Sequence, residues 1–254
     1  MRGGSTVIRL RRTATALLCL ASAVAAAASQ APGPDISGIW LPVDSLSTAW
    51  PDPLPLTDAG RQRHAAFDPD RDEPAGFCMP LGTPRNTLAG VSPMEVLQKA
   101  DRVYFVFQPN LLNAETRRVL IDAPAPVADP DRLPTWMGIS RGRWDGQTLV
   151  VETTEMEPQS ILSADGISQG GKLRMTERWH VEQHPTRGKL LVDEIVLEDP
   201  DTFRAPMRLR RVFAWAPDAR FAEGQCSERL WIDQIWRNRL REHAAQRRTQ
   251  EGAR

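Results

Sequence analysis

Two predicted strands each place one charged residue on an otherwise apolar face, and these two residues have the chemistry of an acid and a base. In the segment 172–181, Glu177 shares its face with Leu173, Met175, Trp179 and Val181. In the segment 207–215, Arg211 shares its face with Met207, Leu209, Phe213 and Trp215. Because successive side chains of a strand point to opposite faces, Glu177 and Arg211 are both predicted to point inward.

An inward carboxylate is costly unless it is paired, and a guanidinium is its natural bidentate partner. We therefore expect Glu177 and Arg211 inside a barrel or sheet core, facing each other or a ligand. One interpretation is a buried ion pair that fixes strand register and has no other role. The other is a site in which they bind a ligand together with Trp179, or in which Glu177 acts as a general acid–base beside Arg211.

Tryptophan gives a second indication of a ligand, since the chain holds eight tryptophans and one tyrosine. Most of the tryptophans are expected to fill the core between the predicted strands. Trp136 stands in the stretch Leu-Pro-Thr-Trp-Met-Gly, where a strand begins, and is the best candidate for the mouth of a cavity. An indole at that place can stack on a ring-shaped ligand.

Signatures of known reactions and cofactors give little support to an enzyme. The sequence contains no His-Glu-x-x-His, no phosphate-binding Walker loop and no dinucleotide-binding Gly-x-Gly-x-x-Gly. The run 138–142 reads Gly-x-Ser-x-Gly, but it falls on a predicted strand and not on the strand-to-helix turn that such a nucleophile requires. The four histidines lack the spacing of metal ligands, so neither a metal nor a cofactor is predicted.

The first 28 residues have the three parts of an export signal. Basic residues extend to Arg12, an apolar segment follows, and small residues at Ala26–Ala28 offer a cleavage site. The apolar segment is shorter than the roughly 20 residues of a membrane span. We expect residues 29–254 to form one domain, periplasmic or secreted, with no integral membrane span. This part carries four more acidic than basic residues, which argues against nucleic acid as a partner.

Two cysteines, Cys78 and Cys226, remain after the leader. In an oxidising compartment an isolated pair of cysteines is most simply a disulfide, and two unpaired buried thiols are the alternative. A disulfide would close a loop of about 150 residues and contribute at most ~4–5 kcal/mol in the chain-entropy model.

The elements that must position these residues are mainly β-strands. Asp145-Gly146 lies between two strand-like runs and predicts a hairpin with a type I′ turn in the middle of an antiparallel sheet. Thr57 is a suitable N-cap for a short helix, and the proline-containing stretch 68–93 is expected to be a loop. From Ser227 to Arg248 the apolar residues recur at helical spacing. Further strands are expected at 103–107, 117–121, 172–181, 189–197 and 207–215.

Seven stretches of the chain together resemble a large family of mostly uncharacterised secreted bacterial proteins. They are 35–40, 56–60, 78–85, 134–138, 142–154, 176–178 and 198–200, and the hairpin is the most specific of them. The resemblance implies a secreted single domain and places Glu177 in a Thr-Glu-Arg motif. Where the family tends to read Asp-Gly-Arg-x-His-Pro, this chain has Asp122-Ala123-Pro124, so no function of that histidine carries over.

The expected fold is mainly β: an antiparallel lipocalin-like barrel or a half-open sheet, with long loops and a C-terminal helix at 227–248. Gly38-Ile39-Trp40 is similar to the Gly-x-Trp of lipocalin-type barrels. These features predict a domain that binds a small, partly apolar ligand, with an aromatic ring as one option, in an internal cavity. The alternatives are a cofactor-independent isomerase, lyase or hydrolase that uses Glu177 with Arg211, and an envelope protein that presents its C-terminal helix to a partner.

Overall fold

The computed structural model describes residues 33–89, 93–108, 114–124, 133–220, 224 and 226–252. The predicted leader at 1–28 and the cleavage site at Ala26–Ala28 lie outside these residues. Within the described part of the chain, no helix combines the length and the apolar character that crossing a membrane requires.

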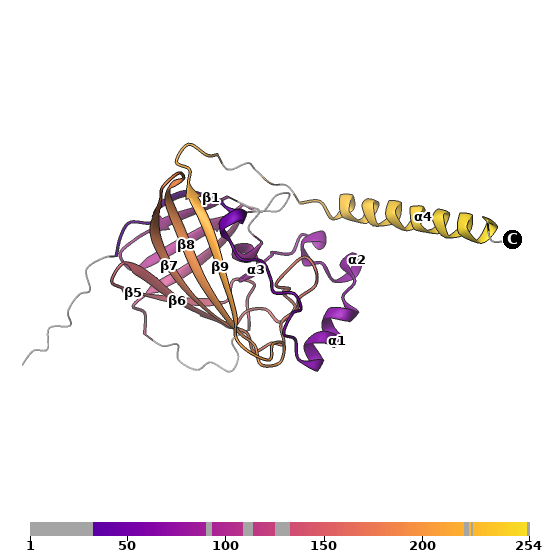
Figure 1. The fold of residues 1–254 in the computed structure, drawn as a ribbon, viewed down its shortest axis with the longest axis horizontal. Coiled ribbons are helices and arrows are strands. Elements are labelled where there is room, and N and C mark those ends of the chain that lie inside the picture. Colours follow the sequence, from indigo (N-terminus) through magenta and orange to yellow (C-terminus); the bar gives the residue numbers. More distant parts are fainter. Residues whose placement is uncertain are drawn as a thin grey trace, which may run out of the picture. The chain divides into compact units, whose positions relative to one another are not determined.

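The described strands close into a barrel of nine members (Figure 1). Each strand pairs with the next one along the chain, and β1 pairs with β9 to complete the ring. The prediction of a mainly β, lipocalin-like barrel with a C-terminal helix is thus confirmed, in its closed form. The strands are β1 Gly38–Pro42, β2 Met94–Gln98, β3 Arg102–Phe107, β4 Glu115–Ile121, β5 Ile139–Asp145, β6 Thr148–Thr154, β7 Arg174–His184, β8 Gly188–Glu198 and β9 Met207–Trp215.

The strand pairing differs from the prediction at two places. The pair β4–β5 is parallel, whereas the sequence predicted an antiparallel sheet throughout. Strand β2 was not predicted, because its five residues directly follow a long proline-containing stretch and expose Leu97 on the outside. Its Met94 and Val96 point inward and are fully buried, as alternation requires.

The central hairpin forms where it was predicted, with a different turn. Asp145 pairs with Thr148, so the two loop residues are Gly146 and Gln147. Gly146 has a φ of 60°, and Gln147 is not among the residues with positive φ. This is the pattern of a type II′ turn, which needs glycine at its first central position, and the predicted type I′ turn is wrong.

The described residues also form six helices. Thr57 caps α1 as predicted, since its side chain accepts a hydrogen bond from the Gly60 N–H. The expected loop at 68–93 contains three short helical segments. The helices are η1 Asp44–Leu46, α1 Asp58–Ala66, α2 Pro69–Asp72, η2 Pro74–Phe77, α3 Arg85–Leu88 and α4 Glu228–Gly252.

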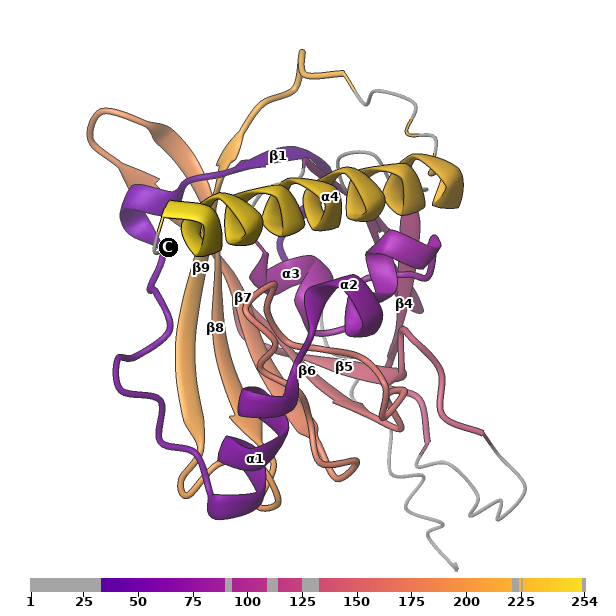
Figure 2. The same ribbon diagram turned by 90° about the vertical axis from the view of Figure 1, so that its right-hand side faces the viewer.

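Helices α1, α2 and α3 lie together on one side of the barrel in both views (Figures 1 and 2). The predicted C-terminal helix corresponds to α4, whose Leu230, Trp236 and Leu240 are exposed. Its Trp231 packs on η2, where a Cβ added to Gly76 would lie 2.3 Å from the indole.

Aromatic side chains fill much of the barrel interior. Trp179 from β7 lies 4.8 Å from Phe105 and 6.0 Å from Phe213, measured between ring centroids. Trp40 is fully buried and meets the edge of Trp215. Trp136, by contrast, belongs to no strand and lies outside this cluster. Trp40, Trp144 and Trp179 thus fill the core as predicted, whereas Trp215 is partly exposed and Trp136 lies outside the cluster.

Candidate functional site

The barrel interior contains a buried ion pair between Arg117 of β4 and Glu177 of β7. The Arg117 guanidinium donates from Nη1 to Glu177 Oε1 at 2.8 Å and from Nη2 to Glu177 Oε2. Both side chains are completely buried. Two hydroxyl groups satisfy further guanidinium hydrogens: Nε donates to Ser140 at 2.9 Å, and Nη2 also donates to Thr153 at 2.6 Å. Ser140 is thus a structural partner on a strand, and the Gly-x-Ser-x-Gly run around it is no nucleophile turn.

Glu177 is buried in the barrel interior as predicted. The residue that faces it, however, is Arg117 and not the predicted Arg211. Arg211 donates to the backbone carbonyl of Thr48 at 3.0 Å, and its burial lowers the pKa of its guanidinium. The arrangement in which Glu177 faces Arg211 is therefore not formed, because Arg117 occupies that role. Arg117 is visible in the sequence by the same alternation, since Val119 and Ile121 fix the inward face of its strand.

A second acid, Asp193 of β8, completes the interior cluster. The strand register places it beside Trp179 on one side and Arg211 on the other. Burial raises the pKa of Asp193 well above its ordinary value, and the negative charge of Glu177 raises it further. Both carboxyl oxygens of Asp193 are buried, and neither has a hydrogen-bond partner among the described residues. Asp193 is fully buried, whereas its neighbour Glu194 is exposed.

Trp136 lines a different feature, a pocket of about 510 Å³ beside the barrel. One wall comes from the segment 63–79, which holds α2, η2 and the end of α1, and the other comes from the β6–β7 connection. Glu177, Trp179 and Arg211 are not among the lining residues. The lining residues are Arg63, Ala66, Phe67, Arg71, Asp72, Pro74, Phe77, Met79, Trp136, Pro158, Gln159, Ile161, Ser168 and Gln169. The predicted ligand residues therefore divide between two places.

Hydrogen bonds attach the pocket walls to the barrel. Trp136 is fixed through its backbone carbonyl, which accepts the Thr83 N–H at 2.8 Å. Glu115, the first residue of β4, accepts the N–H groups of Leu81 at 2.5 Å and Gly82 at 3.1 Å. Gly82 has a φ of 71°, and a Cβ there would lie 2.6 Å from the Trp136 carbonyl oxygen, so the approach of the two segments requires glycine.

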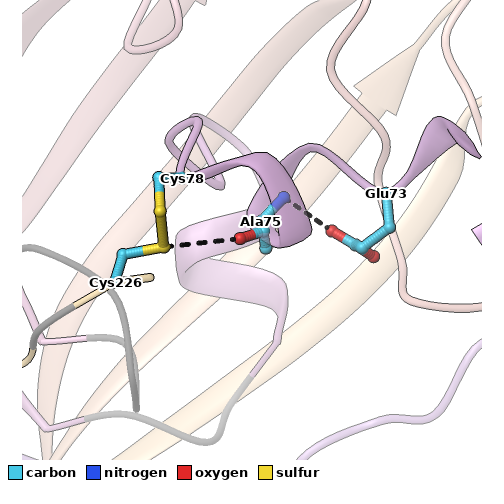
Figure 3. The surroundings of a disulfide bond; sticks show 4 residues. All are labelled: Glu73, Ala75, Cys78 and Cys226. Atoms are coloured by element: carbon cyan, nitrogen blue, oxygen red, sulfur yellow. Dashed lines mark hydrogen bonds between the residues drawn. A yellow bond between two sulfur atoms is a disulfide. The ribbon is translucent and has the colours of Figure 1, made fainter. Parts of the chain in front are cut away.

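The wall that contains α2 and η2 is held by a buried ion pair and by the disulfide. Glu73 accepts two hydrogen bonds from Arg85, at 2.7 and 2.8 Å, and also accepts the Ala75 N–H at 3.0 Å. Figure 3 shows the hydrogen bond between Glu73 and Ala75 beside the bond between Cys78 and Cys226. The two Cα atoms are 5.6 Å apart, and the predicted pairing is confirmed. The disulfide therefore fixes η2 to the segment that leads into α4.

A metal site is not evident in the described part of the chain. No group of three or more His, Cys, Asp or Glu side chains in that part is arranged to hold a metal ion. His180, one of the four histidines, contacts Glu182 at 3.0 Å on the barrel.

Comparison with known proteins does not assign the chain to a family. No protein-family model matches the sequence, and no curated protein is significantly similar to it. The resemblance to secreted bacterial proteins therefore stays a prediction, and the function has to be argued from the two sites themselves.

Proposed function

We propose that this chain is an exported binding domain that holds a small, partly apolar ligand with an aromatic ring in the Trp136 pocket. The pocket itself carries this proposal. Its volume of about 510 Å³ falls in the range of roughly 300–1,000 Å³ that is usual for small-molecule sites. Phe67, Phe77 and Trp136 contribute aromatic surface, and a few polar groups are available for orientation.

The pocket has features of a preformed site. Gly166 has a φ of 82°, and a Cβ at this position would lie 2.2 Å from Phe67, so the loop packs directly under that ring. Gln169 is almost fully buried and donates from Nε2 to the Glu157 carbonyl at 2.7 Å and to Ser160 at 2.6 Å. A rigid wall lowers the entropic cost of ligand binding.

The interior cluster supports catalysis less well than the pocket supports binding. A general acid–base must reach the proton that it transfers. Both carboxylate oxygens of Glu177 accept hydrogen bonds from Arg117, and the side chain has no exposed surface. This geometry favours the buried ion pair that fixes register over the isomerase, lyase or hydrolase alternative.

Export is part of the proposal and rests on two features. The leader-like residues 1–28 predict passage across a membrane. The Cys78–Cys226 bond suits an oxidising compartment such as the periplasm or the exterior.

Titration with N-phenyl-1-naphthylamine, a neutral aromatic probe that fluoresces in apolar sites, tests the binding function. We expect saturable binding that Trp136→Leu weakens about tenfold, since loss of a stacked indole removes of the order of 1.4 kcal/mol. Trp236→Leu is the matched control, because Trp236 is exposed on α4 and outside the pocket. Binding that is indifferent to Trp136→Leu, or equally sensitive to both variants, would overturn the proposal.

A further inference from the structure

The Trp136 pocket is lined by a cation, Arg63, that has no direct carboxylate partner among the described residues. Arg63, in the last turn of α1, donates from Nη2 to the Asp201 carbonyl at 3.0 Å and to the Thr202 hydroxyl at 2.8 Å. These two bonds hold the guanidinium in place against the pocket wall. Its Nε is buried without a partner, and Arg63 forms no ion pair with a described carboxylate. A fixed cation in an aromatic pocket is a recognition element for an anion.

The two acids near the pocket have other direct partners. Arg71 and Asp72, which also line it, pair with each other at 2.7 Å. The buried Asp199 accepts hydrogen bonds from the Gly170 N–H at 2.5 Å and from the Thr202 hydroxyl at 2.8 Å, and that hydroxyl links Asp199 to Arg63. The charge of Arg63 is thus the one without a carboxylate counterpart among the described lining residues.

We infer that the ligand is an aromatic acid, a small ring compound with one carboxylate or sulfonate group that binds Arg63 while its ring lies against Trp136. This inference rests on the proposed binding function and adds the chemical class of the ligand. Phe67 and Phe77 line the same pocket and extend the apolar surface. Nη2 of Arg63 already donates to Asp201 and Thr202 and Nε is buried, so Nη1 is the guanidinium donor that is left for such an anion.

Two probes that share one ring system separate the two claims. N-phenyl-1-naphthylamine is neutral, and 8-anilino-1-naphthalenesulfonate adds a sulfonate to it. We expect Arg63→Gln to weaken the sulfonate probe about tenfold, because a charge-assisted pair is lost, and to leave the neutral probe within about twofold. Arg61→Gln is the matched control, since Arg61 is exposed on the same helix and pairs with Asp58 outside the pocket.

Each outcome decides one claim. A selective loss for the sulfonate probe in Arg63→Gln supports the inference, and a larger loss at low than at high ionic strength supports it further. Equal weakening of both probes would show that Arg63 shapes the pocket, and unchanged sulfonate binding would show that it recognises no anion; either result overturns the inference. If the neutral probe still depends on Trp136 in those cases, the proposed function stands, and if neither probe depends on Trp136, both claims fall.

Discussion

Arg117 and Arg63 are both arginines among aromatic side chains, and their surroundings differ in one respect. Arg117 is completely buried and donates to the carboxylate of Glu177 and to the hydroxyls of Ser140 and Thr153. Arg63 donates to a backbone carbonyl and a hydroxyl, with no carboxylate partner in the described residues, and it lines a pocket. The same side chain is thus paired directly with a carboxylate in one region and linked to Asp199 only through the Thr202 hydroxyl in the other.

This difference separates a structural site from a recognition site. A buried charge that is fully compensated holds strands in register, and removing one partner is costly because the other stays buried and unpaired. A cation without a direct carboxylate partner can be removed at a smaller cost to the fold, because the carbonyl and hydroxyl that it contacts are neutral. The comparison therefore predicts large stability effects in the barrel interior and mainly binding effects in the pocket.

The largest effect is expected for Arg117→Met. It leaves the Glu177 carboxylate without its counter-charge and should lower the free energy of unfolding by about 3–5 kcal/mol, measured by urea denaturation. Arg211→Met is the control, since Arg211 is half-buried on β9 and donates to a backbone carbonyl. It should cost about 1 kcal/mol or less. Similar losses in both variants would contradict the assignment of Arg117 as the partner of Glu177.

An intermediate effect is expected for Cys226→Ser. The disulfide closes a sequence separation of 148 residues, and its loss should lower the free energy of unfolding by ~2–4 kcal/mol. Because it also fixes η2, whose Pro74 and Phe77 line the pocket, probe binding should weaken as well. Fluorescence titration under non-reducing conditions measures this, with Cys78→Ser as the matched variant. Unaltered affinity in both would show that the pocket wall does not depend on the bond.

The smallest effect is a pH dependence in the barrel interior. The pKa of Asp193 is raised in the folded protein, so the native state holds a proton that the unfolded chain releases above its ordinary pKa of about 4. Stability from this group is complete at low pH and is lost as pH rises, by up to ~1.4 kcal/mol per pH unit. Wild type should therefore gain stability over Asp193→Asn between about pH 7 and pH 5 in urea denaturation.

Glu194→Gln supplies the control for this measurement, because Glu194 is the exposed neighbour of Asp193 on β8. The raised pKa of Glu115, which burial causes, contributes equally to all three proteins and cancels in the differences. Parallel stability curves for wild type and Asp193→Asn would mean that Asp193 is ionised in the folded state.

Strand alternation made part of the interior predictable from sequence. It placed Glu177 and Trp179 inward, because their neighbours on the same face are plainly apolar. The same rule applies to Arg117 and Asp193, but each stands beside a second charged residue, Arg118 and Glu194, which makes the segment look solvated. Alternation identifies the face of a residue and does not identify its partner, so Arg211 was paired with Glu177 in place of Arg117.

Strand alternation could not predict the pocket or the residues that line it. Trp136 was recognised from its place at the start of a strand, but Arg63 belongs to a short helix whose residues show no clear apolar face. The lining comes from segments around 63–79, 136 and 158–169, and long-range contacts through Glu115, Glu73 and Cys78 bring them together. No local periodicity encodes contacts between segments so far apart in the chain.

The parallel pair β4–β5 has a consequence for where Trp136 can lie. In a closed ring of strands, every antiparallel contact reverses direction, so the number of reversals has to be even. The nine described strands satisfy this parity with eight antiparallel contacts and one parallel contact. Because β4 and β5 are parallel, both strands begin at the same end of the barrel. Trp136 directly precedes β5, so it lies at the end of the barrel where β4 also begins. The odd number of strands, which requires one parallel contact, therefore places the indole at the pocket.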